Sequence, residues 1–402
     1  MPTSSSRPRL FVIWLTILID LMGFGIVMPI LPYYAQRFGA HGLGYGALVG
    51  AFSLMQFLAT ALLGRLSDRV GRRPILLTTM LLNAAGYVLF AFAPSYFLLL
   101  VSRLVSGFAG GNISAAQAYV ADITSAEDRS KGMGLIGMAF GLGFIIGPGI
   151  GVLAAHYGGH AGPGLVAAGL SLVNLVSAYW ILPESLKQEH RSARDIWPFG
   201  HMAEALAHPE LRALMLVWAI APFAFAGYTV ALPLWAAASL GWEEKQLGAF
   251  FVVVGAVAAI VQGGLFRLLT KRVGDRALLI AGMFGMALAI GAVPFLASTG
   301  AVYAWTVVLA FSNSIMSPAA SGLVSTFAAA NEQGTVLGVA QSLAALGRFS
   351  GPAAIGATYD SITPKVAFLA AAGVMLVGWA VSLGVPHPAG GSRPSSLAPG
   401  AG

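Results

Sequence analysis

The chain has 402 residues, of which 57% are apolar and only 9% are charged, whereas a soluble domain carries about 25% charged residues. So few charges cannot cover a water-facing surface, which excludes a soluble globular protein and indicates that lipid is the solvent for most of the chain. The net charge of +7 agrees in sign with nucleic-acid binding, and the absence of cysteine excludes disulfides and Cys-ligated metals.

Apolar runs long enough to cross a bilayer, about 20 residues each, predict twelve transmembrane helices. Those of the first half lie at 10–33, 43–65, 74–93, 97–120, 131–156 and 163–183. Those of the second half lie at 210–238, 246–268, 277–297, 301–323, 334–358 and 364–386. No small-residue cleavage site follows the first run, so we expect an uncleaved first helix and not a signal peptide.

A polar stretch midway along the chain predicts a cytoplasmic linker between two six-helix bundles. The N-terminal bundle is assigned to 1–183, the linker to 184–209 and the C-terminal bundle to 210–386. The tail, 387–402, is rich in Pro, Gly and Ser and is expected to be disordered. The expected fold is therefore that of an all-α polytopic membrane protein.

The basic residues predict the orientation of these helices. With both termini inside, 17 of the 22 Lys and Arg lie on the cytoplasmic side, three lie in outer loops and two lie within spans. The positive-inside rule requires such an excess. It also explains the net positive charge without nucleic acid, which we do not expect as a partner.

Asp20 lies in the middle of the first predicted span. A carboxylate at that depth costs several kcal/mol unless it is protonated or paired, which makes it a candidate for proton coupling. Arg103 is the buried cation of the first half and the predicted partner. The alternative is a structural Asp that is hydrogen-bonded to the fourth span.

The loop after the second span reads G-R-L-S-D-R-V-G-R-R-P at 64–74. It combines glycines, a carboxylate and guanidinium groups, which are Gly64, Asp68, Arg69, Gly71, Arg72 and Arg73. Arginine forks hold carboxylates through two parallel hydrogen bonds. The pattern indicates a specific ionic contact, and the alternative is ordinary anchoring by positive charge on the inside.

The fifth predicted span is rich in glycine and contains G-x-x-x-G-P at Gly143, Gly147 and Pro148. Small residues four apart let another backbone approach closely. Plain helix packing is therefore expected of this motif, whatever else it does.

Polar and aromatic side chains on the apolar spans predict a substrate pocket between the halves. The set is Gln56, Asn112, Gln117, Phe223, Tyr228, Gln262, Asn313, Gln341 and Arg348. Each amide taken alone is as well explained by hydrogen bonding between helices. Arg348 either contacts substrate, binds helix-end carbonyls or extends its charged end toward water.

The two halves repeat each other. The sequence R-V-G-R-R at 69–73 returns as R-V-G-D-R at 272–276, and the Gly-Pro pair at 147–148 returns at 351–352. Gln56 has its counterpart in Gln262. Near-constant offsets at three places predict an internal duplication into two pseudo-symmetric bundles, with a substrate site near the midplane.

These stretches together resemble the major facilitator superfamily, and within it the drug:proton antiporters that include the tetracycline resistance exporters. The resemblance rests on the segments at 53–77, 118–124, 182–185 and 262–280 and on the Gly-Pro fifth span. It departs from the tetracycline exporters in having no His in the eighth span and no acid in the ninth. The identity of the substrate is therefore open.

The resemblance implies roles for several residues. Asp68 and the arginines of the 64–74 loop would form an interdomain latch, with Asp122 as the acid at the end of the fourth span. The fifth-span motif would be the signature of an exporter. Asp20 and Arg103 would couple transport to protons.

The expected function is proton-coupled efflux of small amphipathic compounds by alternating access, with tetracycline-like drugs foremost. A metabolite or sugar symporter on the same fold is the alternative, and a non-transporting receptor leaves Asp20 and Arg103 unexplained. No Ser-His-Asp spacing, metal cluster or phosphate-binding loop indicates an enzyme. We expect no cofactor or metal, energy from the proton gradient, and a monomer in the inner (plasma) membrane.

Overall fold

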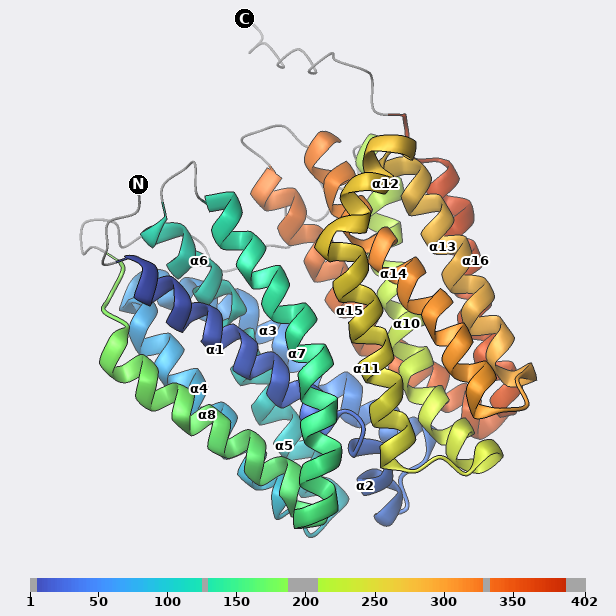
Figure 1. The fold of residues 1–402 in the computed structure, drawn as a ribbon, viewed down its shortest axis with the longest axis horizontal. Coiled ribbons are helices and arrows are strands. Elements are labelled where there is room, and N and C mark those ends of the chain that lie inside the picture. Colours follow the sequence, from blue (N-terminus) through green and yellow to red (C-terminus); the bar gives the residue numbers. More distant parts are fainter. Residues whose placement is uncertain (1–5, 125–128, 187–208, 328–332, 388–402) are drawn as a thin grey trace, which may run out of the picture.

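The computed structural model describes residues 6–124, 129–186, 209–327 and 333–387, and every element of regular structure in these ranges is a helix. The predicted linker and the predicted tail lie largely outside the described residues. The two predicted bundles are seen side by side, the first in blue to green and the second in yellow to red (Figure 1).

The first bundle contains short helical segments, α2 and η1, among its longer helices. Its elements are α1 (Ser6–Val27), α2 (Leu31–Arg37), α3 (Gly42–Val70), α4 (Arg72–Ala91), α5 (Tyr96–Ala109), η1 (Gly110–Asn112), α6 (Ile113–Ile123), α7 (Arg129–Gly158) and α8 (Ala161–Ile181). The segments α5, η1 and α6 follow one another as a single apolar span.

The second bundle contains a π-helical segment, η3, within its second span. Its elements are α10 (Pro209–Leu240), α11 (Glu244–Ile260), η3 (Val261–Leu265), α12 (Phe266–Val273), α13 (Asp275–Ala292), η4 (Val293–Phe295), α14 (Thr299–Phe327), α15 (Gln333–Ser361) and α16 (Pro364–Leu383).

Ten helical segments in the described residues are long and apolar enough to cross a membrane. The predicted spans at 131–156 and 334–358 correspond to α7 and α15, which have 30 and 29 residues. With these two the order of elements is that of the twelve predicted helices.

The first predicted span, 10–33, is too long at its end. Helix α1 ends at Val27, a turn follows, and α2 begins at Leu31. Pro29 lies in the turn and Pro32 in the first turn of α2. Proline lacks an amide N–H and clashes with the preceding helical turn. Here the helix ends two residues before Pro29, whereas α10 runs on through Pro222 and Pro233.

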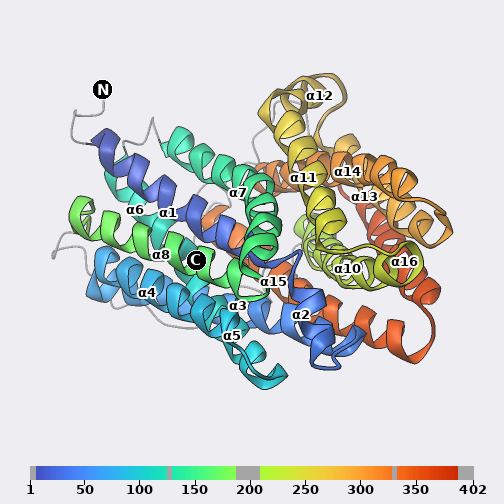
Figure 2. The same ribbon diagram turned by 60° about the horizontal axis from the view of Figure 1, so that its bottom comes forward.

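The halves meet along two pairs of helices. Helix α3 packs against α15, and α7 packs against α11 (Figures 1 and 2). Three glycines at a spacing of four place the backbone of α3 directly against carbonyl oxygens of α15, in the pairs Gly42–Gly356, Gly46–Pro352 and Gly50–Phe349. This spacing forms one face of a helix, so small residues there bring the two backbones together.

Within the described residues, the side-chain hydrogen bonds between the halves lie on one side of the molecule. We call the side at which α1 begins and α16 ends the terminal side, and the opposite side the distal side (Figure 1). On the distal side Asp360 of α15 accepts hydrogen bonds from the backbone N–H of Gly42 and of Leu43, at 2.8 and 2.7 Å. The Tyr33 hydroxyl donates to the carbonyl of Trp242 across the same junction, at 3.1 Å.

Among the described residues, burial differs between the two ends of the second bundle. No residue of α12 is buried, whereas Phe250 and Phe251 near the distal end of α11 are. The distal side of the structure is therefore closed by contacts between the halves.

The predicted internal repeat reappears in the contacts that close each bundle. Arg73 donates a hydrogen bond to the carbonyl of Tyr179 near the end of α8, at 2.7 Å. Its repeat counterpart, Arg276, donates to the carbonyl of Leu383 at the end of α16, at 2.8 Å. Donors and acceptors are 203 and 204 residues apart in sequence, so the same bond is made twice.

Candidate functional site

Asp20 is held by two amide side chains. Its two carboxylate oxygens accept hydrogen bonds from the Nδ2 groups of Asn83 and Asn112, at 3.1 and 2.7 Å. Asn83 lies on α4 and Asn112 closes η1, so three helices converge on this carboxylate. Both asparagines are buried, at 3% and 5% exposure, while Asp20 remains partly exposed.

Arg103 is close to this site but does not pair with Asp20. No ion pair joins the two within the described residues, where the recorded ion pairs are those of Arg72. The guanidinium carbon of Arg103 lies 4.9 Å from the ring centre of Phe90. Its Nε and one Nη have no hydrogen-bond partner in the described part of the chain, although the residue is only 2% exposed.

Tyr87 lies within electrostatic range of both charges. The side chain is 2% exposed, and its hydroxyl lies directly against Gly23, one helical turn after Asp20. A side chain at Gly23 would overlap this hydroxyl. Neither Asn83 nor Tyr87 was predicted from the sequence. The feature that could have identified them is the polar group at every fourth position of an otherwise apolar α4.

The glycines of the fifth-span motif position α1 just beyond Asp20. An added Cβ at Gly143 would lie 2.7 Å from Cβ of Leu21, and one at Gly147 would lie 2.7 Å from the carbonyl of Met22. Pro148 lies against Gly25 from the same direction. The motif is therefore a close crossing of α7 and α1, and its link to export remains a prediction.

Arg72 is the centre of the cluster formed by the 64–74 loop. Its guanidinium is paired with Asp68 at 2.6 Å and with Asp122 at 3.3 Å, and it donates to Ser67 Oγ at 2.6 Å. Arg72 is buried and Asp68 is 43% exposed. Asp68, Arg72 and Asp122 are thus brought together as expected, on elements of the first bundle only.

Glu184 is a member of this cluster that the sequence analysis did not assign. Its carboxylate accepts the backbone N–H of Arg72 and of Arg73, at 2.9 and 3.2 Å, at the N-terminus of α4. A carboxylate is favoured there because the first N–H groups of a helix are unpaired. Gly71, at φ +121°, makes the turn that presents these groups, and Glu184 fills the space where its side chain would be. The sequence feature that could have identified Glu184 is its place as the acid of the L-P-E-S segment at 182–185.

The remaining loop residues have lesser contacts. The Gly64 carbonyl accepts a hydrogen bond from Ser67 Oγ, and the position packs against Ser114 of α6. Arg69 is exposed. Whether the cluster ever reaches the second bundle, as the predicted interdomain latch requires, stays a prediction.

The predicted pocket residues occupy different surroundings. Gln56 donates to the carbonyl of Gly110 at 3.2 Å, two residues from Asn112 at the Asp20 site. Tyr228 is 1% exposed and packs among aromatic rings of the second bundle, 6.0 Å from Phe368 between ring centres. The others are partly buried (Phe223, Asn313, Arg348) or exposed (Gln117, Gln262, Gln341).

Gln262 lies in η3, the π-helical segment between α11 and α12. Such segments are rare and frequently occur at functional sites. Apart from Asn112 and Gln56, the predicted set is not joined by these contacts into one site, and its role as a pocket stays a prediction.

Comparisons with known proteins agree with this architecture. The family model of the Major Facilitator Superfamily matches residues 13–349 and 264–399 of this chain. The class C tetracycline resistance protein of Escherichia coli is 33% identical over 362 residues, which cover 88% of this chain and 90% of that protein. Multidrug resistance protein 2 of Bacillus subtilis is 28% identical over 394 residues, covering 94% and 96%.

Among solved structures, that of the human organic anion transporter MFSD10 (TETRAN) superposes with a TM-score of 0.71 at 25% identity. The match covers 95% of this chain and all of that one. Fold and relatives are those of membrane transporters and not of enzymes.

Proposed function

The chain belongs to the major facilitator superfamily, and from this premise we propose that it is a proton-coupled exporter of small amphipathic compounds. Tetracycline-like drugs are the leading substrates, because relatives named for tetracycline and multidrug resistance match along nearly the whole chain. The substrate and the protons would move in opposite directions by alternating access.

The observation that carries the proposal is the Asp20 site. A carboxylate midway along a membrane span, held by two amides and still partly exposed, has the properties required of a proton carrier. Ionisable groups inside a membrane are costly and mark ion or proton pathways.

The contacts between the halves support the alternating-access part of the proposal. They lie on the distal side, so a substrate would enter the interface from the terminal side. Export then requires the distal contacts to open and the terminal ends to close. The Asp68–Arg72–Asp122 cluster lies at the terminal end of its bundle and is proposed as the latch of that second state.

Orientation follows from charge. The terminal ends of the helices carry Arg65, Arg69, Arg72, Arg267 and Lys271, whereas the distal ends carry Arg37, Lys245 and Lys365. The positive-inside rule then makes the terminal side cytoplasmic and the structure inward-facing, in the inner (plasma) membrane. The transporter is proposed to act as a monomer, with the proton gradient as its energy source and no cofactor.

Asp20→Asn tests the proposal, because asparagine keeps the shape of the side chain but cannot titrate. In proteoliposomes with an acidic interior, the unchanged protein should accumulate tetracycline, and the variant should not exceed the level reached without a gradient. Downhill exchange should persist. Glu244→Gln, an acid in the first turn of α11, is the matched control and should keep gradient-driven accumulation.

The same vesicles separate the alternatives. Accumulation driven by an alkaline interior would indicate a symporter and overturn antiport. An Asp20→Asn variant that still accumulates substrate against its gradient would move proton coupling elsewhere.

Organic anions are a second class of substrate, favoured by one observation. Arg103 is buried and has N–H groups without a partner among the described residues. Such groups are costly unless a ligand satisfies them in some state. The relative MFSD10 is named as an organic anion transporter. Competition by benzoate-like anions for tetracycline accumulation, lost in Arg103→Gln, would support this class.

A further inference from the structure

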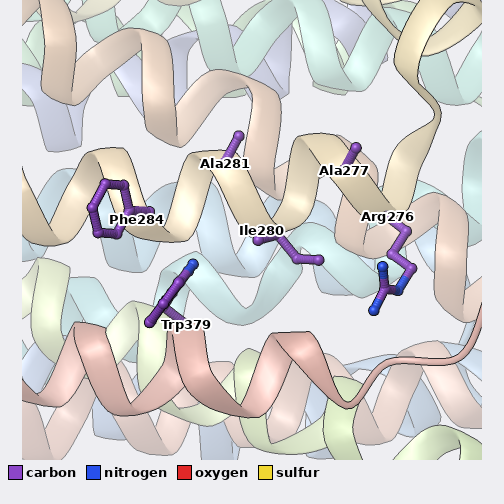
Figure 3. Close-up of a pocket in the computed structure, with 6 residues that line it drawn as sticks. All are labelled: Arg276, Ala277, Ile280, Ala281, Phe284 and Trp379. Atoms are coloured by element: carbon purple, nitrogen blue, oxygen red, sulfur yellow. The ribbon is translucent and has the colours of Figure 1, made fainter.

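A groove runs along the outer surface of the second bundle, between α13 and α16 (Figure 3). Its volume is about 440 Å³, and it is lined by Arg276, Ala277, Ile280, Ala281, Phe284 and Trp379. Both helices lie on the side of this bundle away from the first one (Figure 1). The groove is therefore separate from the Asp20 site and from the junction of the halves.

The walls of the groove face the hydrocarbon of the membrane. Ala277 and Ala281 are exposed, and Phe284 is 41% exposed, so this stripe of α13 is open to its surroundings within a membrane span. Ala277 and Ala281 line the groove on α13, while Ile280 and Trp379 lie between the two helices (Figure 3). The rings of Phe284 and Trp379, 5.4 Å apart between centres, close the end that lies deeper in the span.

Arg276 lies at the terminal end of the groove (Figure 3). Its Nε donates to the carbonyl of Val385 at 2.7 Å and one Nη donates to that of Leu383 at 2.8 Å. A guanidinium has five N–H donors, so these two bonds fix its position and leave donors without a protein partner in the described residues. The side chain is thus held rigidly with unused donors where the span meets water.

The charges around Arg276 are mostly positive. Lys271 and Arg272 are exposed on α12, immediately before α13. Among the described side chains the acid beside Arg276 in sequence, Asp275, is turned the other way, with its carboxylate against Gly322 of α14. An anionic group at the head of the groove would therefore meet cations and not the carboxylate.

From this arrangement we propose that the α13–α16 groove binds an anionic phospholipid. Its phosphate would accept hydrogen bonds from Arg276, and one acyl chain would lie along the alanines toward Phe284 and Trp379. Eight residues of helix separate Arg276 from Phe284, which gives the chain about 12 Å of groove at 1.5 Å per residue. Basic sites beside membrane spans recognise anionic lipid head groups in this way.

A lipid fits better than a soluble anion because most of the lining is apolar and opens into the membrane. The proposal does not depend on the direction or the substrate of transport. A negative test of lipid binding would therefore not contradict proton-coupled export, and a negative test of export would not contradict lipid binding.

Native mass spectrometry of the full-length protein in detergent tests the site. With equal amounts of phosphatidylglycerol and phosphatidylcholine of the same chains, the protein should retain phosphatidylglycerol at least about tenfold more, since the two lipids differ in net charge. Arg276→Gln should abolish this preference. Because that variant also loses bonds to the end of α16, a second variant is needed.

Ala281→Trp fills the groove and leaves Arg276 and its bonds unchanged, so it should reduce retention of phosphatidylglycerol to the level of phosphatidylcholine. Val173→Trp, at a 61% exposed position of α8 far from the groove, is the matched control and should retain the preference. Equal retention of the two lipids by the unchanged protein, or a preference that survives Ala281→Trp, would overturn the proposal.

Discussion

Asp20, on which the proposed coupling depends, accepts hydrogen bonds from two neutral amides, and within the described residues no ion pair joins it to a cation. An asparagine side chain carries both a donor and an acceptor. Asn83 and Asn112 donate to the two carboxyl oxygens here. Such donation suits an ionised carboxylate, and by turning their amides the asparagines could accept from a protonated one. A guanidinium can only donate, so it would favour one charge state throughout the cycle.

Removing one of these amides should separate coupling from transport. In Asn112→Ala the carboxylate loses its shorter hydrogen bond, 2.7 Å, and an unsatisfied group of this kind costs about 1–3 kcal/mol. We expect accumulation driven by a pH gradient to fall about tenfold, while downhill exchange falls less. The ratio of the two rates in proteoliposomes measures the effect.

Asn174→Ala is the control for that ratio, because Asn174 is a buried amide that bonds to the same helix, α1, through Thr16. It should lower the melting temperature without changing the ratio. If the two substitutions alter the ratio equally, the amides at Asp20 have only a structural role.

Sequence alone identified Asp20, Arg103, Asp68 and Asp122 as unusual, because charge inside or beside an apolar span is rare. For Asp68 and Asp122 it also named the partners, the arginines of the 64–74 loop, of which Arg72 makes both ion pairs. For Asp20 it named Arg103, or alternatively a hydrogen bond to the fourth span, where Asn112 lies. The predicted Asp20–Arg103 pair is replaced by bonds to two asparagines, each from a helix more than 60 residues away. Such partners depend on how helices rotate against each other, which hydrophobic runs in a membrane protein do not specify.

At the scale of the element, the two bundles use one device for packing. The motif G-x-x-x-G-P at 143–148 lets α7 cross α1, and the same motif at 347–352 lets α15 cross α10 at Phe223. In lipid, where apolar side chains gain nothing by leaving the solvent, close backbone approach is what holds helices together.

Gly147 and Gly149 of α7, which are two residues apart, test this packing. Gly147→Ala would place a Cβ 2.7 Å from the Met22 carbonyl, so overpacking should destabilise the protein by about 1–3 kcal/mol. Gly149 has open space around it, and Gly149→Ala should be neutral or slightly stabilising because alanine favours the helix. Melting temperatures of the purified variants decide, and equal shifts would contradict the role given to Gly147.

The positions of the elements were largely predictable, since each needs an apolar run of fixed length. What escaped prediction were the irregular places. The break after Val27 lies at Pro29 and before Pro32, although two prolines within α10 cause no break. The π-helical η3 begins at a valine and includes Gln262 with two glycines. Both are local departures from helical geometry within runs whose hydropathy is continuous.

At the scale of the whole molecule, sequence predicts the two-bundle architecture but not which side is closed. Both states of an alternating-access transporter bury the same spans and differ only in contacts between the bundles. Asp360 is such a contact, and nothing in its sequence surroundings distinguishes it. In the structure its carboxylate from the second bundle caps the first N–H groups of α3 in the first bundle.

Asp360 should therefore control how readily the distal side opens. Hydrogen bonds to a charged group contribute about 1.5–3 kcal/mol, and 1.4 kcal/mol changes a two-state ratio about tenfold. Asp360→Ala removes both bonds, so the distally open state should become at least about tenfold more populated.

Spin labels measure that population directly, because the chain has no cysteine and labels go only where one is introduced. Tyr157→Cys and Gly300→Cys place one label on the distal end of each bundle at exposed positions. In Asp360→Ala the distribution of distances between them should gain a longer component. Thr363→Ala is the control, since Thr363 caps α16 within a single bundle, and it should leave the distribution unchanged. An unchanged distribution in Asp360→Ala would mean that the glycine face of α3 keeps the distal side closed without this carboxylate.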